Sequence, residues 1–194
     1  DYLQVEGVCY KLIPIKTPID PDRPYEMGRV NTETMYPLVK SWAWGKRGDQ
    51  DIYYDVESRK NSITYRGNMI RLIDQLIIEN DYVEAEEILD LAMAKMPIED
   101  FGFYTLLEPI INSYYKIEKK DKARDLFEKI AIKYKESLEY FSSISESNKN
   151  RYAEEIYTDI ERYRSLVDVL ISYEEGEYLE NKMKEFNDYL DLFL

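Results

Sequence analysis

Apolar residues recur three or four positions apart through most of the chain from about Val56 to its end. This spacing matches the 3.6 residues of a helical turn, and polar or proline-containing breaks separate the segments that show it. Breaks at Asn80-Asp81, at Pro97 and at 118–121 divide the first half of this region into four segments. The pattern therefore predicts a mainly α fold built from helical hairpins.

The first 57 residues differ from the rest in composition, because they hold five of the seven prolines: Pro14, Pro18, Pro21, Pro24 and Pro37. Proline lacks a backbone N–H and fixes φ, so this region cannot form one long helix. We predict a strand over 5–13, a turn-rich loop over 17–24 and then a short helix. Thr34 is expected to cap that helix, with Pro37 in its first turn.

Four residues of the N-terminal region are expected to be buried or to anchor a helix. Cys9 lies in an apolar alternation, which predicts a small buried residue. Leu38 and the two tryptophans of the chain, Trp42 and Trp44, are expected to anchor the short helix.

One helix pair matches the tetratricopeptide pattern, a helical hairpin of about 34 residues with small residues where the helices cross. With Arg66 as the first position, the large, small and terminal positions fall on Leu72, Leu76, Tyr82, Ala85, Leu89, Ala92 and Pro97. A second, degenerate pair aligns when Ala123 is placed on Ala85. The predicted fold is thus mainly α, with tetratricopeptide-like helical hairpins (an α-α superhelix) and a proline-rich, partly extended N-terminal segment. A generic helical bundle is the alternative.

The predicted organisation has four parts. Residues 1–57 form an extended and short-helix segment that packs on the helical array, and 58–141 form two tetratricopeptide-like helix pairs. Residues 142–150, which read SSISESNKN in their polar stretch, are expected to be a linker, and 151–194 to form a C-terminal helical hairpin.

The last predicted helix follows Gly176 and carries apolar residues at alternating intervals of four and three: Leu179, Met183, Phe186, Leu190 and Phe193. Such a seam suits an antiparallel neighbouring helix. It packs either on helix 151–173 or on a second copy of the chain, which would give a homodimer.

Stacked tetratricopeptide units line a concave surface with the first helix of each unit, and this surface commonly holds a peptide. The inward positions in our register are Ile70, Asp74, Ile77, Glu108, Asn112, Tyr115 and Lys116. Asn112 could hold an extended peptide backbone, since its amide both donates and accepts hydrogen bonds. Alternatively, the flanking segments fill the groove.

The chain is strongly acidic, with 26 basic and 39 acidic residues and a net charge of −13. A field of this sign repels phosphate backbones and anionic lipids, so we expect neither nucleic-acid binding nor membrane-surface binding. No stretch approaches the roughly 18 uninterrupted apolar residues of a spanning helix, so this segment is not expected to insert into a membrane. A protein or peptide partner fits better, although acidic faces can also serve solubility alone.

The composition also limits the chemistry. There is no histidine and only one cysteine, which excludes histidine-assisted nucleophilic catalysis, Cys/His zinc sites and an intramolecular disulfide. Nucleotide-binding and hydrolase motifs are absent from the sequence. The main carboxylate groups, 84–87 and 174–177, are expected on solvated helical faces. We therefore expect no catalytic residue and no cofactor in this segment.

Two short acidic patterns provide the alternative function. Asp20-Pro21-Asp22 and Asp49-Gln50-Asp51 each resemble the DxD signature with which many glycosyltransferases hold a metal and a sugar nucleotide. Asp49, Asp51 and Asp55 could also offer oxygen ligands to calcium. Neither pattern is specific. The 19 tyrosines suit half-buried helix crossings, and they equally suit carbohydrate stacking or a protein interface.

Several N-terminal stretches carry a family resemblance: 3–7 (LQVEG), 10–15 (YKLIPI), 30–32 (VNT), 35–36 (MY) and 44–45 (WG). They resemble the C-terminal soluble region of a family of bacterial multi-spanning membrane proteins of unknown function, related to protein O-mannosyltransferases. The similarity continues through the helical part. In that family the membrane spans and presumed catalytic carboxylates precede this region, so no catalytic residue is carried over.

The resemblance implies an accessory domain of a membrane-embedded, glycosyltransferase-like protein, located on the periplasmic side. Such a domain could bind another protein or the parent's own membrane domain. The chain opens with Asp1 and has no initiator methionine, so we also expect it to be a segment of a longer protein.

Overall fold

The computed structural model describes residues 1–19, 21, 26–44, 52–102 and 107–193. These residues are mainly helical, as predicted, with one small three-stranded sheet near the N-terminus. The chain divides into two compact units, Asp1–Leu106 and Leu107–Leu194. The boundary falls inside the segment 58–141, in which we expected two helix pairs.

The sheet of the first unit begins with a β-hairpin. Strands β1 (Leu3–Glu6) and β2 (Cys9–Leu12) pair antiparallel, and β3 (Arg29–Val30) pairs parallel to β1, which gives the order β2-β1-β3. The single strand predicted over 5–13 was wrong, because Gly7 adopts a φ of +66° and turns the chain. The prediction that Cys9 is buried was also wrong: all four residues of the edge strand β2 are exposed.

The short helix α1 (Thr32–Lys40) begins earlier than predicted. Its N-cap is Asn31, whose side chain accepts a 2.9 Å hydrogen bond from the Thr34 backbone N–H, so Thr34 itself lies inside the helix. Pro37 consequently stands in the interior rather than in the first turn. The buried residues of α1 are Met35 and Val39.

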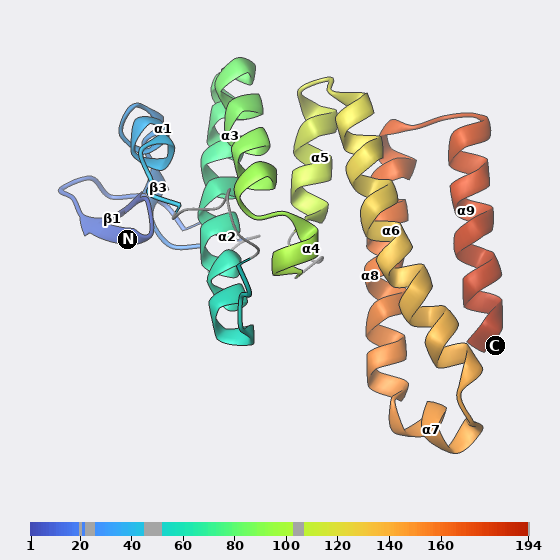
Figure 1. The fold of residues 1–194 in the computed structure, drawn as a ribbon. Helices are drawn as coiled ribbons and strands as arrows, with labels where there is room; N and C mark the ends of the chain where they lie inside the picture. Colours follow the sequence, from blue (N-terminus) through green and yellow to red (C-terminus); the bar gives the residue numbers. More distant parts are fainter. Residues whose placement is uncertain (20, 22–25, 45–51, 103–106, 194) are drawn as a thin grey trace. The chain divides into compact units, whose positions relative to one another are not determined.

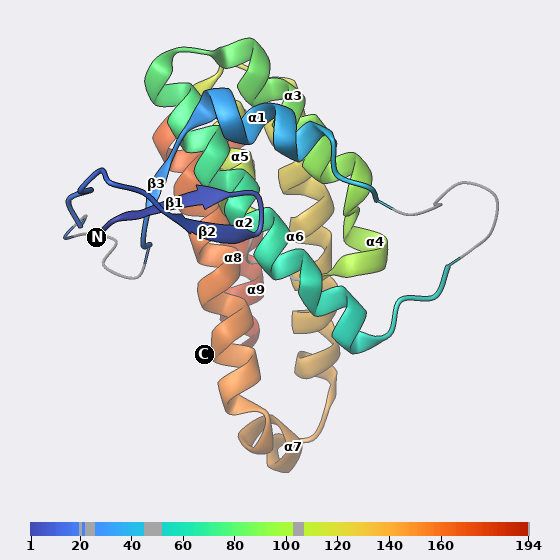
Figure 2. The ribbon, with the colours of Figure 1, turned by 90° about the vertical axis from the view of Figure 1, so that its left-hand side faces the viewer.

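The main helical hairpin of the first unit consists of α2 (Val56–Glu79) and α3 (Tyr82–Lys95), followed by the short helix α4 (Ile98–Phe101). Asn80 ends α2 with a left-handed φ of +66°, which confirms the predicted break. The two helices pack against each other, and α1 packs on both of them (Figure 2). Buried apolar residues of α2 and α3 form the core of the unit: Met69, Leu72, Ile73, Leu76, Ala85, Ile88, Leu89 and Ala92.

The second unit is entirely helical in its described residues. It contains α5 (Glu108–Lys116), α6 (Lys120–Ser143), α7 (Glu146–Arg151), α8 (Ala153–Tyr173), α9 (Glu177–Leu190) and a final 3-10 turn, η2 (Asp191–Phe193). The long helices α6, α8 and α9 lie alongside one another and pack pairwise, and α5 packs on α6 and α8 (Figure 1). Pro109 occupies the first turn of α5, where its missing backbone N–H costs no helical hydrogen bond.

The region predicted as a polar linker, 142–150, is largely helical, since α6 runs to Ser143 and α7 begins at Glu146. The expected C-terminal hairpin is present as α8 and α9, which pack together. Phe186 of α9 is buried and meets Tyr163 of α8 edge-on, with ring centroids 5.3 Å apart. Within the described ranges, no helix combines the length and apolar character that crossing a bilayer requires.

Candidate functional site

The residues of the predicted peptide groove come from two helices, α2 of the first unit and α5 of the second. Asp74 and Ile77 are half-buried on α2 of the first unit. In the second unit, Glu108 is half-buried at the start of α5, and Lys116 is exposed at its end. Burial, together with the nearby charge of Asp168, raises the pKa of the Glu108 carboxyl.

The other two groove candidates, Asn112 and Tyr115, form hydrogen bonds inside the second unit. Tyr115 is buried, donates a 2.9 Å hydrogen bond to Glu174 and stacks on Tyr173 at a centroid distance of 4.9 Å. The amide oxygen of Asn112 accepts a 2.7 Å hydrogen bond from the Tyr173 hydroxyl. Both side chains thus have partners within their own unit, and the groove itself stays a prediction.

Of the acidic residues proposed as metal ligands, Asp55 is the one that the structure describes. Asp20, Asp22, Asp49 and Asp51 lie outside the described residues, whereas Asp55 is the N-cap of α2. The Asp55 carboxylate accepts hydrogen bonds from both the backbone N–H and the hydroxyl of Ser58, which lower its pKa. No cluster of three or more acidic or cysteine residues that could hold a metal occurs among the residues that the structure describes.

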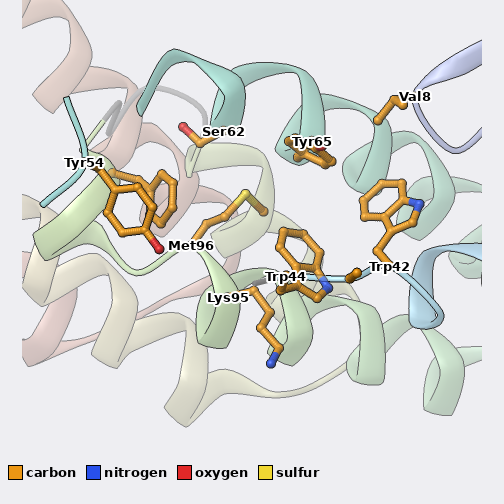
Figure 3. A pocket seen from close by; sticks show the side chains of 10 residues that line it. Val8, Trp42, Trp44, Tyr54, Ser62, Tyr65, Lys95 and Met96 are labelled. Carbon is orange, nitrogen blue, oxygen red and sulfur yellow. The ribbon is translucent and has the colours of Figure 1, made fainter. Parts of the chain in front are cut away.

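An aromatic-lined cavity of about 370 Å³ is the most developed candidate site. We call it the aromatic pocket, and it lies wholly in the first unit (Figure 3). It is lined by Val8, Trp42, Ala43, Trp44, Tyr54, Ser62, Tyr65, Lys95, Met96 and Phe101. This volume falls within the range typical of small-molecule and side-chain binding sites.

One wall of the aromatic pocket is a cluster of three rings. Trp42 and Trp44 follow α1, and both meet Tyr65 of α2. The centroid distances are 5.2 Å for Trp42–Tyr65 and 5.6 Å for both Trp44–Tyr65 and Trp42–Trp44. Edge and tilted contacts of this kind are favourable beyond the area that they bury, so each ring holds the others in place.

The opposite wall comes from the two segments that flank the α2–α3 hairpin. Tyr54 precedes the cap of α2, and its ring lies 4.8 Å from that of Phe101 in α4. The Met96 side chain, which follows α3, extends between Tyr54 and the rings of Tyr65 and Trp44 in Figure 3. Residues from α2, from α4 and from the segments that follow α1 and α3 thus line the same cavity.

Arg66 holds the segment that carries Met96 and Phe101. It is completely buried, and its guanidinium donates to the Met96 carbonyl at 2.6 Å and to the Gly102 carbonyl at 2.7 Å. These carbonyls end α3 and α4, where the helix dipoles favour a positive charge. Burial lowers the pKa of Arg66 to about 10. Arg66 is therefore a positioning residue for the far wall.

The polar groups at the aromatic pocket are mainly donors. Ser62 uses its hydroxyl to donate to the Arg59 carbonyl at 2.7 Å. Lys95 is exposed in the last turn of α3, and the described residues give it no ion pair. The indole N–H of Trp44 is buried without a hydrogen-bond partner.

Sequence reasoning did not find this pocket. The predicted role of Trp42 and Trp44 as anchors does not include their partner ring, because Tyr65 lies at least 65 − 44 = 21 positions away and shares no motif with them. Arg66 was named only as the first position of the tetratricopeptide alignment, and no sequence feature marked the exposed Lys95 as a pocket residue. The two tryptophans just after a short helix, in a tyrosine-rich chain, were the available indication.

No family model, curated protein or solved structure matches this chain.

Proposed function

We propose that this chain is a non-catalytic protein-interaction domain, and that the aromatic pocket receives a large apolar side chain of a partner protein. The observation that carries the proposal is the cavity itself, which five aromatic rings and Met96 line in positions fixed by mutual contacts. Tight protein interfaces are centred on such preformed pockets, which remove an anchor side chain from water.

The chemistry of the lining supports a binding role. The walls are formed mostly by rings and a thioether, and the charged groups at the pocket are cationic, Lys95 at the rim and the buried Arg66 behind Met96. Acyl transfer and general acid–base catalysis need a nucleophile or a base that faces the substrate. Burial of apolar surface, at about 25 cal/mol per Å², is the interaction that these side chains can supply.

We further propose tetratricopeptide-like packing for the hairpin of α2 and α3. The small residues Ala85 and Ala92 are buried on α3 together with Leu89, which is the arrangement that a close helix crossing requires. Leu72 and Leu76 on α2 are fully buried as well. This proposal concerns the first hairpin, whose residues match the pattern best.

The family resemblance gives the context for the proposed interaction. We propose that the domain is an accessory part of a membrane-embedded, glycosyltransferase-like protein and lies on the periplasmic side. Its partner would be another protein or a segment of the parent. The acidic net charge of −13 is consistent with a protein partner rather than a nucleic acid.

Selection of random displayed peptides on the immobilised chain tests the interaction proposal. Both tryptophans line the aromatic pocket, so their fluorescence reports on it directly. We expect the selected peptides to share a large apolar residue and to change the tryptophan emission on titration.

The matched variants are Ala43→Phe and Ala94→Phe. Both alanines are exposed, but only Ala43 lines the aromatic pocket, so the larger ring at 43 obstructs the cavity without burying new surface in the core. Binding should weaken at least about tenfold in Ala43→Phe, as expected for the loss of a buried apolar anchor, and stay unchanged in Ala94→Phe. Equal binding by both variants, or no peptide that changes the emission, would contradict the proposal.

A further inference from the structure

Strand β2 forms one edge of the sheet, and part of its backbone has no neighbouring strand. The Ile13 N–H donates to the Tyr2 carbonyl at 2.9 Å, so the hydrogen-bonded pairs with β1 fall on every second residue from there. The N–H and C=O groups of Tyr10 and Leu12 consequently point away from β1, and no described residue bonds to them on that side. These two residues offer backbone donors and acceptors at the spacing of a strand.

The side chains along this edge are apolar and exposed. Val8 directly precedes β2, and with Tyr10 and Leu12 it follows the two-residue alternation of a strand; the three residues are 45%, 49% and 78% exposed. Proteins usually protect an edge strand with an unpaired charge, a proline or a bulge. The charge of β2, on Lys11, is paired with Glu6 of β1 at 3.2 Å, and the strand contains no proline. In the described part of the chain, the edge of β2 is thus open to a further strand.

The open edge of β2 leads to the aromatic pocket. Val8 lines the pocket, and Figure 3 shows its side chain beside the ring of Trp42. A carbon placed on the neighbouring Gly7 would lie 3.4 Å from the same ring. A chain that pairs with Tyr10 and Leu12 would therefore reach the pocket two residues beyond Tyr10, which is about 7 Å along a strand.

We propose that the partner protein binds through an extended segment, which adds to β2 as an antiparallel strand and inserts its apolar anchor into the aromatic pocket. This inference rests on the proposed function and deepens it by naming the conformation of the partner. Main-chain hydrogen bonds then supply affinity, and alternate side chains supply specificity. The partner residues opposite Tyr10 and Leu12 bond to β2, and their side chains lie on the same face as an anchor opposite Val8.

One peptide and its two N-methylated isomers test the inference on the full chain, with tryptophan fluorescence as the readout. Acetyl-Thr-Val-Thr-Val-Gly-Phe-Gly amide places its valines opposite Leu12 and Tyr10 when its phenylalanine lies opposite Val8. Methylation of both valine nitrogens removes the donors that face β2, so the affinity should fall at least about tenfold. Methylation of both threonine nitrogens alters donors that face away from β2, and it should change the affinity by less than about threefold.

The variants Leu12→Pro and Leu12→Ala test the same hydrogen bond from the side of the chain. Proline removes the outward N–H of Leu12 and is tolerated on an edge strand, whereas alanine keeps the N–H and shortens the side chain. Leu12→Pro should weaken binding of the unmethylated peptide at least about tenfold, and Leu12→Ala by less than about threefold. Far-UV circular dichroism checks that both variants fold, and the methylated isomers test the bond on the wild type if Leu12→Pro does not.

Different results separate this inference from the proposed function. Equal losses for the two methylated isomers, or wild-type affinity in a folded Leu12→Pro, would overturn strand addition, while the change in emission would still support an apolar anchor. No change in emission with the unmethylated peptide would also overturn strand addition, and the anchor would then be judged by the selected displayed peptides alone. A dimer in light scattering that Leu12→Pro dissociates would show that the edge pairs with a second copy of the chain instead.

Discussion

Arg124 donates two hydrogen bonds of 2.7 Å to the carboxylate of Glu174, one to each oxygen. The Glu174 side chain is completely buried, and it also accepts from Tyr115 and pairs with Lys120 at 2.8 Å. Glu174 follows α8 and joins it to α5 and α6 of the same unit. Our expectation that the carboxylates of 174–177 lie on a solvated face was therefore wrong for Glu174, because three partners offset the cost of its burial.

Replacing Glu174 with Gln is expected to lower the free energy of unfolding at pH 7 by about 3 kcal/mol, since it leaves buried donors without their charged partner. The hydrogen bonds from Arg124 hold the pKa of Glu174 at about 2, below its ordinary value of 4.5. A lowered folded-state pKa stabilises the protein above the unfolded-state value, and this stabilisation is lost as the pH falls towards the folded-state value. The gap between wild type and variant should therefore narrow between pH 5 and pH 2.

Urea titrations followed by far-UV circular dichroism at several pH values measure this gap. Glu175→Gln is the control, because it removes the same charge from an exposed neighbour. It should change stability by less than about 0.5 kcal/mol at every pH. A gap for Glu174→Gln that does not vary with pH would show that the carboxylate charge is not what binds Arg124.

We predict that removing the hydroxyls of two buried tyrosines, Tyr163 and Tyr115, changes the free energy of unfolding in opposite directions. Tyr163 is fully buried between Tyr134 and Phe186, and its hydroxyl has no partner among the described residues. Tyr163→Phe removes an unsatisfied polar group and should raise the free energy of unfolding by about 1 kcal/mol. Tyr115→Phe removes the bond to Glu174 and should lower it by about 2 kcal/mol, the usual contribution of a hydrogen bond to a charged group.

Thermal and urea unfolding of the two tyrosine variants provides the comparison. Both substitutions delete one oxygen from a buried ring, so differences in cavity size do not enter. If Tyr163→Phe destabilised the chain as much as Tyr115→Phe, the Tyr163 hydroxyl would have to be hydrogen-bonded in solution.

The helices could be predicted from the sequence because their signals are local. The apolar spacing, Asn80 and Pro97 identified α2 and α3 within a few residues. The hairpin of β1 and β2 was not predicted, because a single glycine in an apolar run is a weak turn signal in a sequence. In the structure, Gly7 adopts a positive φ and the chain reverses direction there.

The candidate site was not predictable for a different reason. The aromatic pocket joins residues from β-turn, loop and helix segments that are far apart in sequence, and no periodicity connects Trp44, Tyr54 and Met96. Likewise, Glu174 and Glu175 are adjacent acidic residues, yet only Glu174 is buried, because the chain direction after α8 turns its side chain towards Arg124. Such choices depend on tertiary contacts, which composition and spacing do not encode.

The close packing of α2 on α3 gives a third prediction. Ala92 is 1% exposed on α3, so Ala92→Leu adds three carbons to a filled interface. This should lower the free energy of unfolding by about 1–3 kcal/mol. Ala94→Leu places the same side chain at an exposed position of the same helix and should be close to neutral. Tryptophan fluorescence during urea unfolding measures both, and equal stabilities would contradict a close helix crossing at Ala92.

Substitutions in the C-terminal helix α9 provide the last prediction, because they distinguish packing within the unit from a homodimer interface. Phe186 is the buried residue of α9 and meets Tyr163 of α8 edge-on, whereas Met183 is 40% exposed. Phe186→Ala should weaken the docking of α9 by about 3 kcal/mol and increase the hydrogen exchange of backbone amides in 177–190. Met183→Ala should have little effect on either. Light scattering distinguishes the alternative: if α9 binds a second copy, both variants should reduce the measured mass, because Met183 then lies in the interface. If α9 packs only within its own unit, the mass is the same for wild type and both variants while exchange increases in Phe186→Ala alone, and this is the outcome that we expect from the edge-on contact with Tyr163.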